Sequence, residues 1–579
     1  MAPAFNLIVS RNVPSGSLPS DFVLPRKDKD LIMLAYIRSR LAFAALASAV
    51  AGCGSGVAAG AASDVGNPND ASSGNGFADS GSQIDGGSAT DSSLLSNADS
   101  ASSNPESGSS DGDGSSLSDG VTDDNIETGA DSSGAADSGA NESGTEAGSG
   151  EGALANGAMA FPAPNSQGVC PDPPLRITFS APPTLGTSGM IQVFNAATPG
   201  TAVAALNMAA TTFSDAIGGT TFNILRPAYV DGNDAVIYLK SHALTYGQTY
   251  YVTVDTGAIL PPTGTLSVTG TTAWRFSTAA AAPFNVTSLT VALNGSGNFC
   301  SVQGAIDAIP AKNTATSQIL IDAGIYHEII HLTAKNNITL LGQSRTGTII
   351  EGTNNNNMNP STVGRSLVGI DGSSGLVVDT LTITNLTPQG GSQAEALRLE
   401  TCDECIVRNA NINSRQDTLL WDGRLYADNC TISGNVDFVW SSGAAYFNNC
   451  IIHTVGQAGA VVQARNSPST YGYVFVDSQL TADPGVTGQV LARIDVSDYP
   501  GSNVAYINCT MGSFISPAGW AITDGTPTSE LRFWEYESVD TSGNPIDVSK
   551  RIAGSTQISA TEAASIRDPT VVLSGWNPQ

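Results

Sequence analysis

Short apolar runs separated by glycine, asparagine and aspartate dominate the chain over 283–579. One amphipathic helix is predicted, over 301–309, and Pro310 ends it. The apolar runs recur at about twenty to thirty residues, and three of them end in Asn-Cys, at 429–430, 449–450 and 508–509. A β-rich unit repeated at this spacing predicts a right-handed parallel β-helix, because a propeller blade requires about forty residues.

A different pattern occupies 166–282. Polar and apolar residues alternate there in runs such as 177–179 and 250–254, and turn residues interrupt the runs every dozen or so positions. Period-two alternation of this kind predicts an antiparallel β-sandwich. The stretches PLRITFSAP, LTYGQTYYVTV and WRFST resemble bacterial immunoglobulin-like domains. We expect this segment to be a spacer or a weak carbohydrate-binding module.

Composition changes again over 54–165, which consists mostly of Gly, Ser, Ala, Asp and Asn, with Phe77 and Phe161 as its two aromatic residues. Such a segment buries too little apolar surface to offset its ordering entropy, so we predict a disordered linker. The predicted fold class is therefore all-β: a linker, an Ig-like β-sandwich and a parallel β-helix. The formal net charge of −28 excludes a nucleic-acid binder driven by counterion release.

Residues 1–53 have the layout of an export signal. Two arginines precede an apolar run over 41–50 that is too short to span a bilayer. The four residues that end at Cys53 resemble the lipobox of bacterial lipoproteins, which implies lipidation of Cys53 and a membrane anchor. We expect an outer-membrane lipoprotein at the cell surface or periplasmic face; the alternative is an ordinary signal cleaved after 47–49 and a secreted protein. The true start is predicted at Met33.

Candidate chemistry appears as a ladder within the β-helix. Residues one coil apart lie about 4.8 Å from each other, because that is the strand spacing. Asp417 and Asp437 are twenty residues apart, which predicts two carboxylates at about 5 Å. Such a pair does not ionise independently, so one serves as an acid while a nearby arginine keeps the other charged. The remaining polar members of the ladder are Gln393, Gln416, Gln463, Arg465 and Arg493.

Six segments in this region resemble the pectin methylesterase (pectinesterase) family, over about 290–579. One of them, QDTL, is identical to a family motif, and QAEAL and VDFVWS are similar to the family's QAVAL and VDFIFG. In GIYHE, the matched Tyr326 and Glu328 are expected to be structural. The segments, in chain order, are NGSGNFCSVQGAIDAIP (294–310), GIYHE (324–328), QAEAL (393–397), QDTL (416–419), VDFVWS (436–441) and GWNP (575–578).

The resemblance implies a role for each matched residue. Asp437 would attack the C6 methyl-ester carbonyl of a galacturonate unit. Asp417 would protonate the departing methanol and then activate water. Gln393 and Gln416 would donate hydrogen bonds to the oxyanion. Arg493 would hold Asp437 ionised and oriented, and the reaction needs no metal and no cofactor.

The chain also departs from the family pattern. Where the family has L-G-R-P-W, residues 491–495 read LARID, so the aromatic residue that would stack on a sugar ring is missing. Trp421 and Trp440 are the candidate replacements, although a lone tryptophan on a strand is as often a core residue. Gln463 and Arg465 are candidates for lining the substrate groove, with coil stacking as the alternative.

Cysteine usage fits an exported protein. Cys430 and Cys450 occupy equivalent positions on successive coils, and we predict a disulfide between them. Cys402 and Cys405 are close enough in sequence for a local bridge. No histidine lies at ligand spacing from a cysteine or an acid, so no metal site is predicted.

The resemblance makes a carboxylic ester hydrolase the leading interpretation, with methyl-esterified pectin as substrate and methanol as product, formed through an acyl-enzyme. We expect a monomer. Three alternatives remain open: an esterase or thioesterase for another substrate, a polygalacturonase or lyase on the same scaffold, and a surface carbohydrate-binding protein that has lost catalysis. The two glutamines favour the ester hydrolase, because glycoside cleavage has no use for an oxyanion hole.

Overall fold

The structure, a computed structural model, describes residues 151–154 and 157–579. The predictions for the export signal, Cys53 and most of the linker lie outside the described residues. Within the described part, no helix is both long and apolar enough to cross a membrane.

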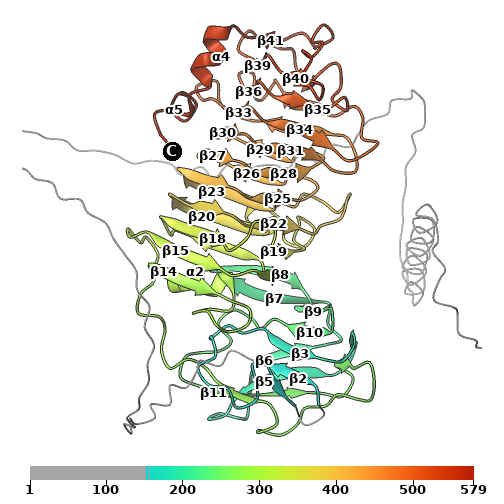
Figure 1. Cartoon of the computed structure of the whole chain (residues 1–579), viewed down its shortest axis with the longest axis vertical. Coiled ribbons are helices and arrows are strands. Elements are labelled where there is room, and N and C mark those ends of the chain that lie inside the picture. The colour runs from blue at the N-terminus through green and yellow to red at the C-terminus, as the bar shows by residue number, and fades with distance from the viewer. Residues whose placement is uncertain (1–150, 155–156) are drawn as a thin grey trace, which may run out of the picture. The chain divides into compact units, whose positions relative to one another are not determined.

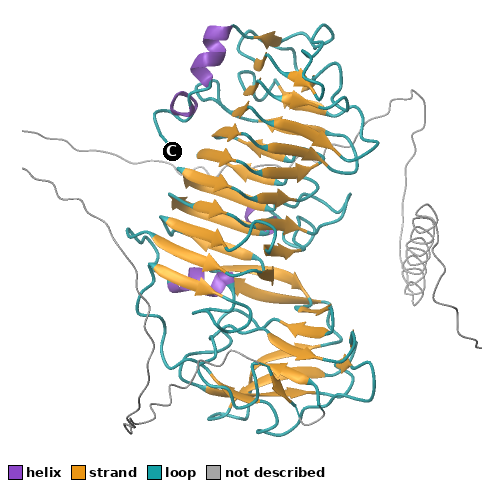
Figure 2. Ribbon diagram, viewed as in Figure 1, coloured by secondary structure: helices purple, strands orange, loops and turns teal. Residues whose placement is uncertain are grey.

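Most of the described residues wind into a parallel β-helix built from three parallel sheets (Figures 1 and 2). The first sheet contains β14 (Ser288–Val291), β15 (Ser317–Ile321), β18 (Ile338–Gly342), β21 (Val377–Asp379), β24 (Cys405–Arg408), β27 (Arg424–Asp428), β30 (Ala444–Asn448), β33 (Tyr473–Val476), β36 (Asn503–Ile507), β39 (Arg532–Tyr536) and β41 (Ser555–Gln557). The second contains β16 (Gly324–His327), β19 (Thr348–Gly352), β22 (Thr382–Asn385), β25 (Asn411–Asn413), β28 (Thr431–Gly434), β31 (Ile451–Thr454), β34 (Gln479–Ala482), β37 (Thr510–Met511) and β40 (Val539–Asp540).

The third sheet carries the polar ladder on its outer face. It contains β17 (Ile330–Thr333), β20 (Val368–Ser374), β23 (Leu397–Asp403), β26 (Leu419–Trp421), β29 (Val439–Ser441), β32 (Ala460–Ala464), β35 (Val490–Asp495) and β38 (Trp520–Asp524). The helices within 151–154 and 157–579 are α2 (Val302–Ala308), α3 (Thr362–Arg365), α4 (Ala560–Ile566) and α5 (Pro569–Val572). The predictions of an all-β chain, of a parallel β-helix and of a helix ending before Pro310 are confirmed.

The Asn-Cys repeat has a conformational cause. Asn429, Asn449 and Asn508 have φ of 52°, 50° and 51°, the left-handed region that asparagine tolerates better than most residues. Each asparagine turns the chain between the first and second sheets, and the cysteine after it points into the core. The repeat therefore marks one corner of successive coils.

The predicted disulfide between Cys430 and Cys450 is wrong. Both cysteines are buried and free, and the Cys430 Sγ lies 3.2 Å from the carbonyl oxygen of Val407. Residues stacked in a parallel sheet have nearly parallel Cα–Cβ bonds at the strand spacing of about 4.8 Å, whereas a disulfide needs Cβ atoms about 3.8 Å apart. Equivalent positions on successive coils thus favour stacked thiols. The local bridge between Cys402 and Cys405 is present.

Antiparallel strands precede the β-helix and share an apolar core of their own. One sheet has the order β1 (Gly152–Ala153), β2 (Met159–Phe161), β3 (Leu175–Thr178), β10 (Asp234–Ile237) and β9 (Ala228–Asp231). The other has the order β13 (Arg275–Ser277), β11 (Thr249–Val254), β5 (Met190–Asn195) and β6 (Ala202–Asn207). The short pair β4 (Thr184–Leu185) and β12 (Ile259–Leu260) and the hairpin β7 (Thr212–Ile217) and β8 (Thr220–Leu225) complete it.

The predicted end of the linker at residue 165 is wrong. Strands β1 and β2 already belong to the sandwich, and β2 pairs with β3 through Met159↔Thr178 and Ala160↔Ile177. Phe161 is fully buried, and the Trp274 indole donates a hydrogen bond of 2.8 Å to the carbonyl of Pro162. Phe161 was one of two aromatic residues in an otherwise polar segment, and it is a core residue of the folded part.

The β7–β8 hairpin belongs to the sandwich segment in sequence but packs on the β-helix. Ile217 and Phe222 lie in the same apolar cluster as the first coils, and the Phe222 ring meets His331 edge-on at 5.6 Å. The side chain of Asn359 binds the main chain of Asn223 at both its N–H and its carbonyl, each at 2.7 Å. The hairpin therefore packs against the first coils, where Val302 and Ile306 of α2 join the same apolar cluster.

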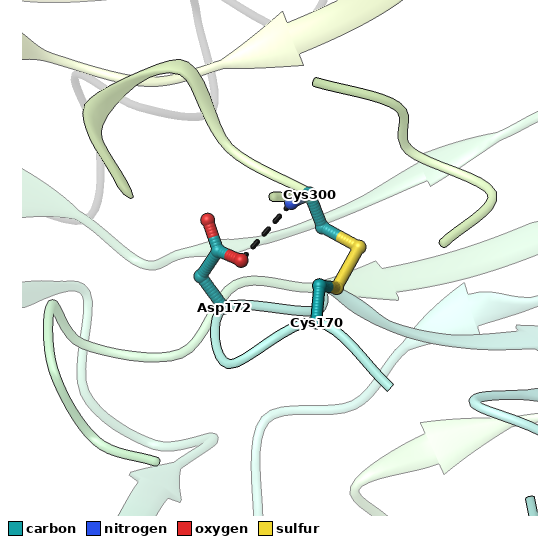
Figure 3. Close-up of side chains that lie close together, drawn as sticks. All are labelled: Cys170, Asp172 and Cys300. Carbon is teal, nitrogen blue, oxygen red and sulfur yellow. Dashed lines mark hydrogen bonds between the residues drawn. A yellow bond between two sulfur atoms is a disulfide. The ribbon is translucent and has the colours of Figure 1, made fainter. Parts of the chain in front are cut away.

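A disulfide that was not predicted joins Cys170 of the sandwich to Cys300 at the start of the β-helix (Figure 3). Beside it, the Asp172 carboxylate accepts hydrogen bonds from the N–H groups of Cys300 at 3.0 Å and Ser301 at 2.9 Å, and from the Ser301 hydroxyl. Among the described residues, Cys170, Asp172 and Cys300 form the group of side chains whose potential metal-ligating atoms lie close together. The two sulfurs are bonded to each other, so they are not free to bind a metal. The cluster is a covalent cross-link with a capping carboxylate.

The family-like segment 324–328 is structural, as expected. Tyr326 is fully buried, and its hydroxyl donates to the carbonyl of Asp322 at 3.0 Å. The Glu328 carboxylate accepts from the N–H groups of Val302 and Gln303 at 2.9 and 3.0 Å. It thereby binds the first turn of α2 to the second coil.

We predict that replacing Cys170 and Cys300 together by serine lowers the free energy of unfolding by about 5 kcal/mol, because this bridge closes a loop of 130 residues. Urea unfolding measures the change. The double replacement of Cys402 and Cys405 is the matched control and should cost less, because its loop spans three residues. Equal losses for both pairs would contradict the role of the long bridge.

Candidate active site

The two candidate aspartates occupy the same corner of neighbouring coils. Asp417 precedes β26 and Asp437 precedes β29, and the strands pair in register with Leu419↔Val439. Both have positive φ, 64° and 51°, which aspartate tolerates in tight turns. The Asp417 N–H donates to the carbonyl of Val436 at 3.2 Å, so the coil-to-coil ladder continues through the turn. The predicted juxtaposition is present.

Arg493 binds Asp437 through two parallel hydrogen bonds. Its Nε donates to Oδ1 at 2.7 Å and its Nη2 donates to Oδ2 at 2.6 Å. The Asp437 side chain is only 3% exposed. A two-point contact with a guanidinium fixes both the charge and the orientation of a carboxylate. The predicted contact between Arg493 and Asp437 is therefore present.

Asp417 meets a second arginine that the sequence did not reveal. The Arg365 Nη2, at the end of α3, donates to Asp417 Oδ2 at 3.1 Å. The same guanidinium binds Glu395, with Nη2 donating to Oε1 at 2.7 Å and Nε to Oε2 at 2.9 Å. Glu395 lies 22 residues before Asp417, the offset at which Leu397 pairs with Leu419, so it occupies the equivalent corner of the preceding coil. Three carboxylates thus stack on successive coils between two arginines.

Burial and like charge act on Asp417 in the same direction. Loss of water around its carboxyl raises its pKa well above the usual value, and the nearby Glu395 carboxylate raises it further. Arg365 opposes both effects without cancelling them. Burial also raises the pKa of Glu395. Asp417 is therefore suited to hold a proton beside the arginine-bound Asp437.

The two glutamines flank this corner. Gln393 and Gln416 are both half-buried, and the Gln416 carbonyl accepts from the N–H of Ala394, so the two residues lie on adjacent coils. The Ser392 hydroxyl donates to the Gln393 side-chain oxygen at 2.9 Å, which leaves the Gln393 amide nitrogen available as a donor. Their predicted place beside the aspartates is consistent with this arrangement, and their role stays a prediction.

The outer face of the third sheet carries a row in strict register. Leu420 pairs with Trp440, Trp440 with Gln463, and Gln463 with Arg493. The Arg465 guanidinium lies 4.9 Å from the Trp440 ring centroid, and its Nη2 donates to Gln463 at 2.8 Å. Trp440, which is 9% exposed, thus lies beside Gln463 and Arg465 next to Asp437, and the role of these residues in lining a groove stays a prediction.

The proposal of Trp421 as a sugar platform is wrong. Trp421 is 1% exposed and meets the rings of Phe447 and Tyr473 edge-on at 5.7 and 5.2 Å. It pairs with Ser441, whereas Trp440 pairs with Leu420, so the two tryptophans point to opposite faces of the sheet. The period-two rule, applied to both strands together, would have separated them.

A model of the family "Pectinesterase" matches residues 288–572. Pectinesterase 31 of Arabidopsis thaliana is 32% identical over 206 residues, which cover 33% of this chain and 64% of that protein. Probable pectinesterase 56 of the same plant is 32% identical over 243 residues, which cover 40% of this chain and 84% of that protein. The chain belongs to the pectinesterase family.

The solved structure of the pectin methylesterase from carrot is similar at 26% sequence identity and a TM-score of 0.46, covering 50% of this chain and 93% of that one. The pectinesterase region of this chain follows a sandwich that lies outside the family match. The chain spans 64% of the length of Pectinesterase 31 and of the pectinesterase of Petunia integrifolia.

We predict that Arg493→Ala lowers the free energy of unfolding by about 3 kcal/mol, because it leaves the buried Asp437 carboxylate without its charge partner. Chemical denaturation measures the effect. Arg408→Ala is the control: Arg408 is 48% exposed, and its partner Asp379 keeps hydrogen bonds from Thr380 and Asn409, so the loss should stay below about 1 kcal/mol. Similar losses for both variants would contradict this assignment.

Proposed function

We propose that this pectinesterase-family chain hydrolyses the methyl esters of galacturonate units in pectin and releases methanol. The observation that carries the proposal is the two-point contact of Arg493 with Asp437 beside Asp417, whose raised pKa favours the protonated form. One carboxylate is thereby prepared for attack and its neighbour for proton donation at the same pH.

The proposed reaction has two steps, formation of an acyl-enzyme and its hydrolysis. The Asp437 carboxylate attacks the ester carbonyl carbon, and the Gln393 and Gln416 amides stabilise the oxyanion. The carbon–oxygen bond to the methoxy group then breaks, and the leaving oxygen takes the Asp417 proton, which gives methanol and an acyl-enzyme. Asp417, now a carboxylate, removes a proton from water as that water attacks the same carbon. Asp437 departs as a carboxylate, and Asp417 again holds a proton.

The surface around Trp440 supports an acidic polysaccharide as the substrate. Arg465 places a positive charge on the outer face of the third sheet, close to Asp437. Its guanidinium lies 4.9 Å from the Trp440 ring centroid. Galacturonate units freed of their esters carry carboxylates, which a guanidinium binds well. Stacking of a sugar on Trp440 is part of this proposal.

We also propose that the chain is an exported lipoprotein, with the lipid on Cys53 and an acidic linker between the anchor and the folded part. The apolar run and the small residues that end at Cys53 support it. Two disulfides in the described residues fit an oxidising compartment. We further propose that the sandwich is an immunoglobulin-like domain and that the protein is a monomer.

Asp437→Asn tests the proposed activity. The amide keeps the shape of the side chain and removes the nucleophilic charge, so we expect methanol release from esterified pectin to fall at least about 10³-fold. Circular dichroism should remain unchanged. Asp547→Asn, at an exposed loop aspartate, is the control and should keep wild-type turnover.

Wild-type protein that forms new reducing ends or unsaturated ends without methanol would overturn the esterase proposal. Undiminished methanol release by Asp437→Asn would show that another residue is the nucleophile.

A further inference from the structure

The Arg365–Glu395 pair is a buried ion pair that directly contacts the candidate acid. The two side chains are 9% and 0% exposed, and Arg365 binds Glu395 and Asp417 through the same nitrogen. The Arg365 guanidinium also lies 5.7 Å from the Trp440 ring. The pair thus links the Asp417 corner to the outer face of the sheet.

Stability alone does not account for this pair. Removing an arginine and a glutamate from water costs several kcal/mol per ion, and well-packed apolar residues of similar volume are often as stable or more so. Glu395 is fully buried, and Arg365 is 9% exposed. The chain therefore keeps two buried charges in direct contact with the candidate acid.

Main-chain contacts hold Arg365 in place. The buried Asn354 amide donates to the carbonyls of Gly364 and Ser366, both at 2.8 Å, on either side of Arg365. Asn359, which binds the β7–β8 hairpin, donates to Asn354 Oδ1 at 2.8 Å. The guanidinium therefore has a fixed position relative to Asp417, which a flexible surface arginine would not have.

We propose that Arg365 and Glu395 are positioning residues that hold Asp417 and set the pH range in which it carries its proton. The inference rests on the proposed function, in which Asp417 must be protonated when methanol departs. Glu395 neutralises the charge of Arg365, so Arg365 can orient the Asp417 carboxyl without forcing it to ionise. Loss of Glu395 alone would leave an uncompensated cation 3.1 Å from Asp417.

Other charged groups also act on Asp417, or on Arg365 and Glu395, and contribute to the pKa of Asp417 in the wild-type protein. Asp437 lies on the next coil and is bound by Arg493, and Arg465 follows β32. On the preceding coil, Arg398 acts on Glu395 and Glu400 acts on Arg365. The groups that face Asp417 or its two partners are Arg365, Glu395, Arg398, Glu400, Asp437, Arg465 and Arg493.

The sign of the pH effect follows from the mechanism. Activity falls on the alkaline side as Asp417 loses its proton, so this limb of the kcat/KM profile reports Asp417 in the free enzyme. Glu395→Gln keeps the size of the side chain and removes its charge. We expect the alkaline limb to move about 1–2 pH units lower, because the cation then favours ionised Asp417.

A double variant separates this effect from simple structural damage. Arg365→Met with Glu395→Val removes both charges, so the alkaline limb should return to within about half a pH unit of wild type, even where kcat is reduced. The matched control is Glu535→Gln, which breaks another buried pair, with Arg551, whose contacts are 2.8 and 2.9 Å. This control should lose stability without moving the limb.

A second readout does not depend on activity. Titration of ¹³C-labelled aspartate carboxyls, with Asp417→Asn used to identify the Asp417 signal, should show the same downward shift in Glu395→Gln. A wild-type protein that releases no methanol would refute the proposed function, while this titration would still test the positioning role. Two results would overturn the inference. One is a Glu395→Gln variant in which neither the Asp417 titration nor the alkaline limb moves. The other is a double variant in which they move as far as in Glu395→Gln.

Discussion

Everything at the candidate site depends on the hydrogen-bonded stacking of one coil on the next. Parallel pairing brings residues twenty or so positions apart into lateral contact and repeats the same corner at each level. A charge placed at one level therefore meets the charge at the next, whatever separates them in sequence. Glu395, Asp417 and Asp437 lie at one corner for this reason, and the arginines at either end limit the repulsion that such a stack would create.

The sequence predicted what repeats and missed what does not. The coil spacing placed Asp417 beside Asp437, and the family resemblance implied the contact of Arg493 with Asp437, which the structure contains. Arg365 was missed because it lies on a short helix outside the repeat, 52 residues from Asp417, and its contact arises only in three dimensions. Glu395 could have been predicted from the sequence, because it lies one coil before Asp417, at the same offset as the paired residues of the neighbouring strands.

Errors in the predictions came from treating positions one at a time. Equivalent positions were taken as sufficient for a disulfide between Cys430 and Cys450, although side chains that stack in parallel keep their sulfurs apart unless the backbone moves. Trp421 and Trp440 were considered separately, although the register of their two strands places them on opposite faces of the sheet. The bridge between Cys170 and Cys300 joins segments with no shared repeat, so spacing gave no indication of it.

The β7–β8 hairpin changes what the sandwich means for this protein. A solenoid has an open end at which main-chain groups and apolar side chains would otherwise meet water or a second molecule. Ile217 and Phe222 lie against that end, and Asn359 holds the hairpin there. The hairpin and α2 together shield apolar side chains of the first coils, so a shortened chain without the sandwich segment would expose part of that cluster to water.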